Sequence, residues 1–447
     1  MRSIDPIARG LGAGANVAIN GQWARGGGPI LGFVGDSRFA NSILSSGVSS
    51  GRTMQAAASW IEFLTYGRVR CPMSYNKAVG GTGTSDLAGQ ITNVVAVTPR
   101  ATHVAILTGT NTINNAASAT GLMTTMQAYF RAAWAQLNAA GITPITVLDL
   151  PRQWTDTTLT AAVKRRLHNE LNNWLRQAAP LYGSMLIDPV WVLTDPANAN
   201  GECLTSYYYA EATKIHPGPT GSYQIGLLFK TMFEENGLPP RYVGFGKGDI
   251  YDATNNLHGN IISEGGICAS TGGTVSGANP PTGDVPLGWI LRNDTGSADL
   301  TSCVGSLEAR TDGPGNWFKV VATSTGPVTV LIYNQGALNC AIGDTVQFGI
   351  DVLMDASSDL QQCDVSIKDI AGGGSVNAGK YAMQFGTLAT IGAMQGTWAG
   401  RAITDPITMG ASFATLRWGV SIQLDGVGGG FTVRLGAAFL RKTFSTL

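Results

Sequence analysis

The stretch Ile30-Leu31-Gly32-Phe33-Val34-Gly35-Asp36-Ser37 decides the fold of the first half of the chain. A short apolar run bounded by glycine is typical of a buried strand, and this run ends directly before a polar Asp-Ser pair. In open α/β sheets, ligands bind just beyond the carboxyl ends of the strands, which is where Ser37 falls. A hydroxyl placed there becomes a nucleophile when a base reaches it and an oxyanion is stabilised nearby. Ser37 is therefore a candidate nucleophile, although Gly, Asp and Ser are also common turn residues.

Strands and helices are predicted to alternate from this stretch to about residue 238. Each predicted element is a short apolar run or has apolar residues spaced by three and four. These elements cover residues 104–107, 122–137, 144–150, 159–175, 185–187 and 221–233. Strands separated by helices indicate βαβ units and a mainly parallel sheet. We therefore predict a three-layer α/β/α domain over residues 29–240.

The pattern changes near Gly237-Leu238-Pro239-Pro240, after which long helical patterns cease. Short alternating runs such as 328–333 and 345–352 follow, separated by glycine-rich turns. Such runs are typical of an all-β sandwich, which we predict over residues 241–447 as a carbohydrate-binding or oligomerisation domain. Residues 1–28 are rich in Gly and Ala, and we interpret them as a lead-in or attachment segment.

Composition excludes several classes of function. The net charge is +0, so no global basic field attracts nucleic acid. No apolar stretch of about 18 residues predicts a membrane span, and the N-terminus lacks the basic and apolar segments of a secretory signal. The six cysteines are scattered without a C-x-x-C pair or a His/Cys spacing typical of zinc. We expect mostly buried free thiols, or a disulfide among the last four cysteines if the protein works outside a cell, and we expect no metal and no cofactor.

Acyl transfer by a serine also needs a base, an oxyanion hole and usually an acid that orients the base. His216 is the candidate base, because two prolines stiffen its loop directly before the last predicted helix. The stretch 76–82 contains a Gly-Gly turn that can present backbone N–H groups. Asn111 follows a predicted strand and can donate from its side-chain amide.

Other residues could play these roles. Gly47-Val48-Ser49-Ser50-Gly51 fits the pattern G-x-S-x-G, but no apolar strand leads into it as that turn requires. His103 begins a predicted strand and is interpreted as structural. His168 lies in a predicted helix beside two arginines, and we expect it to face solvent.

Four blocks in chain order resemble those of the SGNH hydrolases, also called the GDSL esterase family: Gly35-Asp36-Ser37, Asn76 to Gly81, Gly109-Thr110-Asn111 and His216-Pro217. The resemblance covers residues 30–236. It implies that Ser37 is the nucleophile and His216 the base. It further implies that Gly81 and Asn111 donate hydrogen bonds to the oxyanion.

Two residues depart from the family pattern. The third block usually continues with Asp, where this chain has Thr112, and the last block usually has Asp where this chain has Thr213. The acid that orients His216 is thus missing from its expected place. Three carboxylates could replace it: Glu211, Asp188 and Asp195. We predict instead that His216 works in a Ser-His dyad or binds a backbone carbonyl near Thr213, with Asp188 slightly favoured among the carboxylates.

The sequence therefore predicts a serine esterase that removes short acyl groups, chiefly acetyl, from a carbohydrate. The β-rich second half resembles jelly-roll modules of carbohydrate-active enzymes. With the lead-in segment, it also resembles bacteriophage tail proteins that deacetylate host surface polysaccharide, many of which are trimers. A virion or extracellular location follows from that resemblance. The alternatives are a lipid esterase or thioesterase, and a glycan-binding tail or adhesion protein without catalysis.

Overall fold

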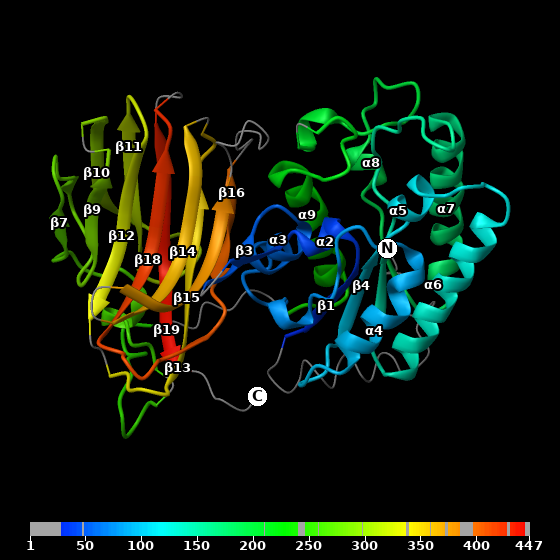
Figure 1. Cartoon of the computed structure of the whole chain (residues 1–447). Helices are drawn as coiled ribbons and strands as arrows, with labels where there is room; N and C mark the ends of the chain where they lie inside the picture. Colours follow the sequence, from blue (N-terminus) through cyan, green and yellow to red (C-terminus); the bar gives the residue numbers. More distant parts are fainter. Residues whose placement is uncertain are drawn as a thin grey trace, which may run out of the picture. The chain divides into compact units, whose positions relative to one another are not determined.

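The computed structural model describes residues 28–46, 49–209, 211–239, 246–257, 259–296, 298–336, 339–357, 359–371, 374–384, 397–426 and 430–442. The predicted lead-in segment lies outside the described residues, apart from Gly28. Two compact units are present (Figure 1). The first takes the described parts of Met1–Ser42, Ala56–Ile61 and Arg68–Pro240, and the second takes those of Ile43–Gln55, Glu62–Gly67 and Arg241–Leu447.

A parallel sheet of four strands lies at the centre of the first unit, in the order β1-β4-β5-β6. The strands are β1 (Leu31–Gly35), β4 (His103–Leu107), β5 (Thr143–Val147) and β6 (Met185–Ile187). Every residue of β1 and β4 is buried. Strands buried on both faces read as continuous apolar runs, which is why the sequence reveals them so clearly.

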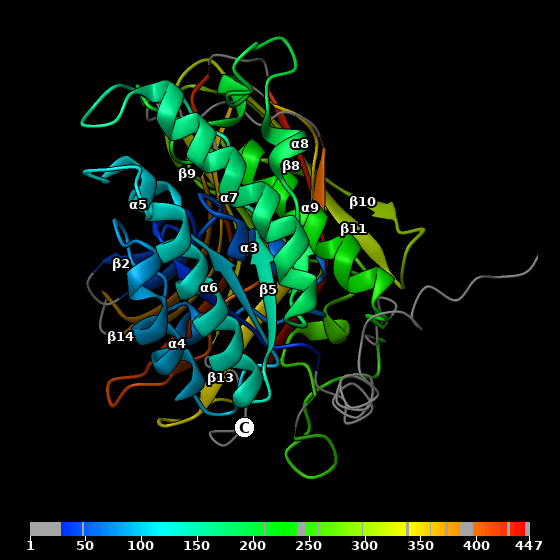
Figure 2. The same ribbon diagram turned by 90° about the vertical axis from the view of Figure 1, so that its right-hand side faces the viewer.

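Helices cover both faces of this sheet (Figure 2). The described α-helices that lie wholly or partly in the first unit are α2 (Ser37–Ala40), α3 (Ala57–Leu64), α4 (Leu87–Val95), α5 (Thr110–Asn114), α6 (Leu122–Ala139), α7 (Ala161–Leu181), α8 (Val190–Leu193) and α9 (Pro219–Glu235), and the end of α3 from Glu62 onward belongs to the second unit. Buried residues of α4, α6 and α7 form one core cluster with the sheet. Residues of α3 and α9, such as Ile61 and Phe229, form the second cluster. The predicted three-layer α/β/α arrangement is confirmed.

The second unit is built from two large, mainly antiparallel sheets. One has the order β16-β13-β19-β11-β10-β8 with β17 beside β13, and the other has the order β2-β3-β15-β14-β18-β12-β9-β7. The strands after residue 240 are β7 (Thr274–Ser276), β8 (Thr282–Gly283), β9 (Ile290–Thr295), β10 (Leu300–Ala309), β11 (Asn316–Ser324), β12 (Val328–Gly336), β13 (Thr345–Met354), β14 (Leu360–Ala371), β15 (Gly374–Gln384), β16 (Trp398–Ile403), β17 (Ile407–Thr408), β18 (Thr415–Leu424) and β19 (Phe431–Lys442). Burial alternates along β12 and β18, as expected where one sheet face is covered. The all-β prediction for this part of the chain is confirmed.

Two strands from the first half of the sequence belong to the second unit. β2 (Ile43–Ser46) pairs with β3 (Ser49–Thr53), which runs parallel to β15. The predicted range 29–240 instead assigned this hairpin to the α/β domain, because it falls between the first strand and the first helix. Ser49 therefore lies in a strand of a sheet and not in a nucleophile turn. Sequence order alone cannot reveal pairing with a strand some 330 residues later.

All six cysteines are free thiols. Burial raises the pKa of Cys203 to about 11 and that of Cys268 to about 12, so both thiols stay protonated near neutral pH. Neither thiol is therefore suited to act as a nucleophile. Among the described residues, no helix combines the length and apolar character that crossing a membrane requires.

Candidate active site

Ser37 begins α2 directly after β1, at the carboxyl end of that strand. The turn requires glycine at Gly35, because φ is +128° there and a Cβ atom would lie 1.9 Å from the carbonyl oxygen of Leu107. Gln90 of α4 secures the same turn from its buried side chain. Its amide oxygen accepts from the Gly35 N–H, and its nitrogen donates to the Gly35 carbonyl at 2.9 Å. These contacts fix the backbone of the turn and therefore the position of the Ser37 side chain.

Three buried charged residues surround the backbone of Ser37. Asp36 Oδ1 accepts hydrogen bonds from the Arg38 N–H at 3.1 Å and from Arg38 Nε at 2.8 Å. Arg38 Nη1 also lies 2.6 Å from Asp149 Oδ1, just beyond β5. Burial disfavours the Arg38 charge, but Asp149 and Asp36 together raise its pKa above the ordinary value. The Arg38 guanidinium thus stays charged and links Asp36, on the other side of Ser37, to Asp149 at the end of β5.

Two histidines of the first unit are buried away from solvent. His168 Nε2 lies 3.0 Å from the Asp149 carbonyl oxygen and 3.1 Å from that of Leu150. The expectation that His168 faces solvent is therefore wrong, because it lies on the buried face of α7 with Leu167 and Leu171. Burial lowers the pKa of His103 to about 4, which keeps that imidazole neutral. A neutral, buried His103 agrees with its predicted structural role.

The structure brings His216 to Ser37. Ser37 Oγ lies 2.7 Å from His216 Nε2, which is hydrogen-bonding distance. The loop that carries His216 is held by its own ends, since the Tyr209 N–H donates to the His216 carbonyl at 3.1 Å and Tyr208 pairs with Pro217. The side chains of Ser37 and His216 are both partly exposed, so a substrate can reach them.

Glu211 binds the other ring nitrogen of His216. The distance from His216 Nδ1 to Glu211 Oε2 is 3.0 Å. Glu211 Oε1 accepts from the N–H groups of Ile215 and His216, both at 2.6 Å. Burial raises the pKa of this carboxyl group, but the hydrogen bonds and the charge of His216 outweigh it, and the net pKa is lowered. Glu211 is therefore a carboxylate at neutral pH.

The prediction of a Ser-His dyad is thus wrong, and so is the preference for Asp188. A turn in which the Lys214 N–H donates to the Glu211 carbonyl folds the loop back. Glu211 therefore lies within hydrogen-bonding distance of His216, although it precedes His216 by five residues. Lys214 has a φ of +42°, a conformation that tight turns use. Asp188 pairs with Arg176 at 2.8 Å instead, and Asp195 accepts from the Ala197 N–H at 2.9 Å.

The predicted oxyanion donors lie around one turn beside Ser37. A Cβ atom on Gly80 would come within 3.8 Å of Ser37 Cβ, so this turn borders the nucleophile. Gly81 has a φ of +80°, and in the described part of the structure its N–H makes no hydrogen bond. The Asn111 side-chain nitrogen donates to the Thr82 carbonyl at 2.9 Å and so reaches the same turn. One N–H of that amide remains available to a ligand.

Thr112, which replaces the usual Asp of the third block, has a clear structural role. Its hydroxyl accepts from the Thr84 N–H at 2.9 Å. The backbone of Gly83 passes so close that a Cβ atom there would lie 2.6 Å from Thr112 Oγ1. Thr112 therefore ties α5 to the loop that follows Gly81. Nothing in the sequence pattern predicted this contact.

Comparison with known proteins gives one family and several similar structures. Residues 33–223 match the family described as GDSL-like Lipase/Acylhydrolase. A GDSL-like lipase from Bacteroides thetaiotaomicron is 13% identical over 46% of this chain and 88% of its own, with a TM-score of 0.35. The acetylxylan esterase Axe2 from Geobacillus stearothermophilus is 18% identical over 47% and 94%, with a TM-score of 0.34. Tailspike protein 4 of bacteriophage CBA120 is 12% identical over 35% and 20%, with a TM-score of 0.25. No curated protein matches the chain.

Proposed function

We propose, from the match of residues 33–223 to the GDSL-like lipase/acylhydrolase family, that the protein is a serine esterase that removes acetyl groups from a carbohydrate. The observation that carries the proposal is the chain of contacts from Ser37 through His216 to Glu211, with links of 2.7 and 3.0 Å. A hydroxyl, an imidazole and a carboxylate in this order are the parts that acyl transfer by serine requires.

In the proposed mechanism, Glu211 accepts from Nδ1–H of His216 and so leaves Nε2 free to take a proton. Ser37 Oγ attacks the ester carbonyl carbon while its proton passes to Nε2, and the negative charge develops on the carbonyl oxygen. The resulting imidazolium then gives the proton to the leaving sugar alkoxide, which leaves an acetyl-serine. Water, deprotonated by the same imidazole, releases acetate and regenerates Ser37.

The groups that border Ser37 favour a small, polar substrate. Gly80 and Gly81 carry no side chains, and Thr82 and Asn111 are polar. These four residues offer hydrogen bonds to a sugar, and the exposed apolar side chain of the same turn, that of Val79, is short. We further propose that the two-sheet unit attaches the protein to a polysaccharide or to other copies of itself. The place of the protein in a phage tail or outside a cell, and its assembly as a trimer, remain predictions.

Release of acetate tests this proposal directly. The purified full chain is incubated with a panel of acetylated polysaccharides, and free acetate is measured. Chromogenic esters from acetate to decanoate are compared in parallel. We expect acetate release from at least one polysaccharide and a rate that falls as the acyl chain lengthens. A rate that instead rises towards decanoate would assign the site to lipid or thioester substrates and contradict the proposal.

Asn111→Ala is expected to lower kcat on a chromogenic acetate by about 10²–10³, because one donor to the oxyanion is lost. KM should change little, since the ground-state carbonyl bears less charge than the oxyanion. The matched control is Asn115→Ala, an exposed Asn at the end of the same helix, which should retain full activity. An Asn111→Ala enzyme within threefold of the wild type would remove Asn111 from the oxyanion hole.

A further inference from the structure

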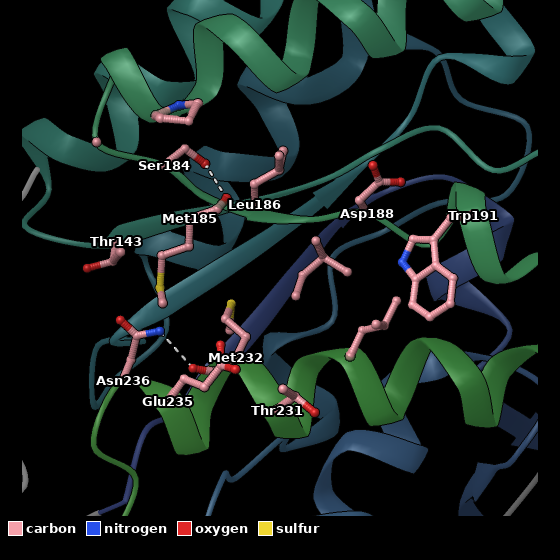
Figure 3. A pocket seen from close by; sticks show the side chains of 14 residues that line it. Thr143, Ser184, Met185, Leu186, Asp188, Trp191, Thr231, Met232, Glu235 and Asn236 are labelled. Atoms are coloured by element: carbon pink, nitrogen blue, oxygen red, sulfur yellow. Dashed lines mark hydrogen bonds between the residues drawn. The ribbon is translucent and has the colours of Figure 1, made fainter. Parts of the chain in front are cut away.

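A cavity of about 530 Å³ lies at the open edge of the parallel sheet of the first unit (Figure 3). β6 is the last strand of that sheet, so its outer edge pairs with no other strand in the described part of the chain. The floor is formed by Met185 and Leu186 of β6, and α9 contributes Leu228 and Met232. A cavity of this size is large enough to hold a small organic ligand.

The cavity is separate from the catalytic residues. α9 begins three residues after His216, and the helix lines the cavity only from Leu228 to its end. At 1.5 Å per residue, these positions lie about 14 to 24 Å along the helix from Pro219. β6 is three strands away from β1, or about 14 Å across the sheet. A ligand here would therefore not occupy the place of the reacting ester.

Trp191 of α8 dominates one end of the cavity. Its side chain is 71% exposed, although large apolar side chains of soluble proteins are mostly covered. Figure 3 shows its ring beside Asp188, at the end opposite Glu235 and Asn236. An exposed indole offers a flat apolar face together with an N–H donor, which suits a ligand that is apolar on one side and polar at its edge.

The charged groups that line the cavity are two carboxylates, those of Asp188 and Glu235. Asp188 is held in place by Arg176 at 2.8 Å and by the Val190 N–H at 3.0 Å. Glu235 forms no ion pair within the described residues, and Thr231 also lines the cavity. Carboxylates accept hydrogen bonds from sugar hydroxyls, and they repel anionic ligands. The lining thus fits an uncharged sugar better than a phosphate, a carboxylate or an acidic sugar.

We propose that this cavity is a second glycan-binding site, which stacks one uncharged sugar unit on Trp191, where Asp188 accepts from its hydroxyls, and places a neighbouring unit of the same glycan at Glu235. The inference rests on the proposed function, because it assigns the ligand to the polysaccharide whose acetyl esters reach Ser37. A chain held at both places raises the local concentration of ester at the nucleophile. The site should therefore lower KM for the polysaccharide and leave the hydrolysis of small esters unchanged.

Affinity electrophoresis tests this inference, because it reports binding whether or not hydrolysis occurs. The full-length protein and its Trp191→Ala variant are run in native gels cast with each polysaccharide of the panel. We expect at least one polysaccharide to retard the wild type, with an apparent affinity about tenfold weaker in Trp191→Ala. Trp191→Phe, which keeps a ring, should recover most of the retardation. The control is Tyr129→Ala, which removes an exposed aromatic ring from α6.

Kinetics provide the second measurement. Trp191→Ala should raise KM for the acetylated polymer about tenfold and leave kcat/KM for a small chromogenic acetate unchanged. Equal retardation of Trp191→Ala and wild type, or no retardation in any gel, would overturn the inference. A change of oligomeric state in Trp191→Ala with unchanged glycan binding would also overturn it, since the exposed Trp191 side chain would then be part of an interface between copies of the chain. Absence of ester hydrolysis by the wild type would instead count against the proposed function.

Discussion

Ser37→Ala is expected to lower kcat on an acetate ester by about 10⁶, the size of loss seen when a triad nucleophile is removed from another serine hydrolase. The alanine keeps the backbone N–H and the Asp36–Arg38 contacts, so the fold should be unchanged. Only the atom that forms the acyl-enzyme bond is missing. The measurement is hydrolysis of a chromogenic acetate, with circular dichroism to verify the fold.

A covalent probe distinguishes a catalytic Ser37 from the alternative of a glycan-binding protein without catalysis. A fluorophosphonate should label Ser37 in the wild type, because Oγ displaces fluoride from phosphorus with His216 as base. Ser37→Ala should remain unlabelled. The matched control is Ser49→Ala, which alters the serine of the G-x-S-x-G sequence and lies in β3, and both labelling and rate should persist in it. Activity that survives in Ser37→Ala would contradict the assignment of the nucleophile.

The sequence predicted the elements that depend on local patterns. β1 and its Gly-Asp-Ser turn were visible because the strand is a continuous apolar run and the turn can take only glycine at Gly35. His216 was visible because prolines mark its loop and α9 begins directly after it. These features are written in adjacent residues, and a single sequence is enough to find them.

The features that the sequence did not reveal depend on contacts between distant residues. The pairing of β3 with β15 and the ion pair of Arg38 with Asp149 join segments far apart in the chain. The buried His168 also contacts Asp149, since its Nε2 lies 3.0 Å from the Asp149 carbonyl oxygen. A charged Arg and a His in a sequence are usually assigned to the surface, and only packing shows otherwise.

Glu211 is the most informative miss, and it supports the second prediction of large effect. Glu211→Gln is expected to lower kcat on acetate esters by about 10⁴, as replacement of the triad acid by its amide does in a serine protease. The backbone N–H groups of Ile215 and His216 both require an acceptor at the place of Oε1. The amide oxygen must therefore occupy that place, which turns the NH₂ group towards Nδ1. Nδ1 then accepts, the proton moves to Nε2, and Nε2 can no longer take the proton of Ser37.

The matched controls are Asp188→Asn and Asp195→Asn, which change the two other carboxylates that the sequence offered. Neither side chain contacts His216, so kcat should stay within threefold of the wild type. A decrease in kcat of more than about 10³ in either variant, with an active Glu211→Gln, would show that Asp188 or Asp195, and not Glu211, is the acid that orients His216. KM should change little in Glu211→Gln, because the substrate does not bind the carboxylate.

The pH dependence of stability provides an independent check on Glu211. Its pKa is lowered in the folded protein, so its ionised form stabilises the fold above the unfolded pKa of about 4.3, and this contribution is lost as the pH falls through the lower folded value. The difference in Tm between the wild type and Glu211→Gln should therefore shrink as the pH falls below about 4. A difference that instead grows towards acid pH would mean that Glu211 is protonated in the folded protein. A protonated Glu211 could not hold His216 in the tautomer that the proposed reaction needs.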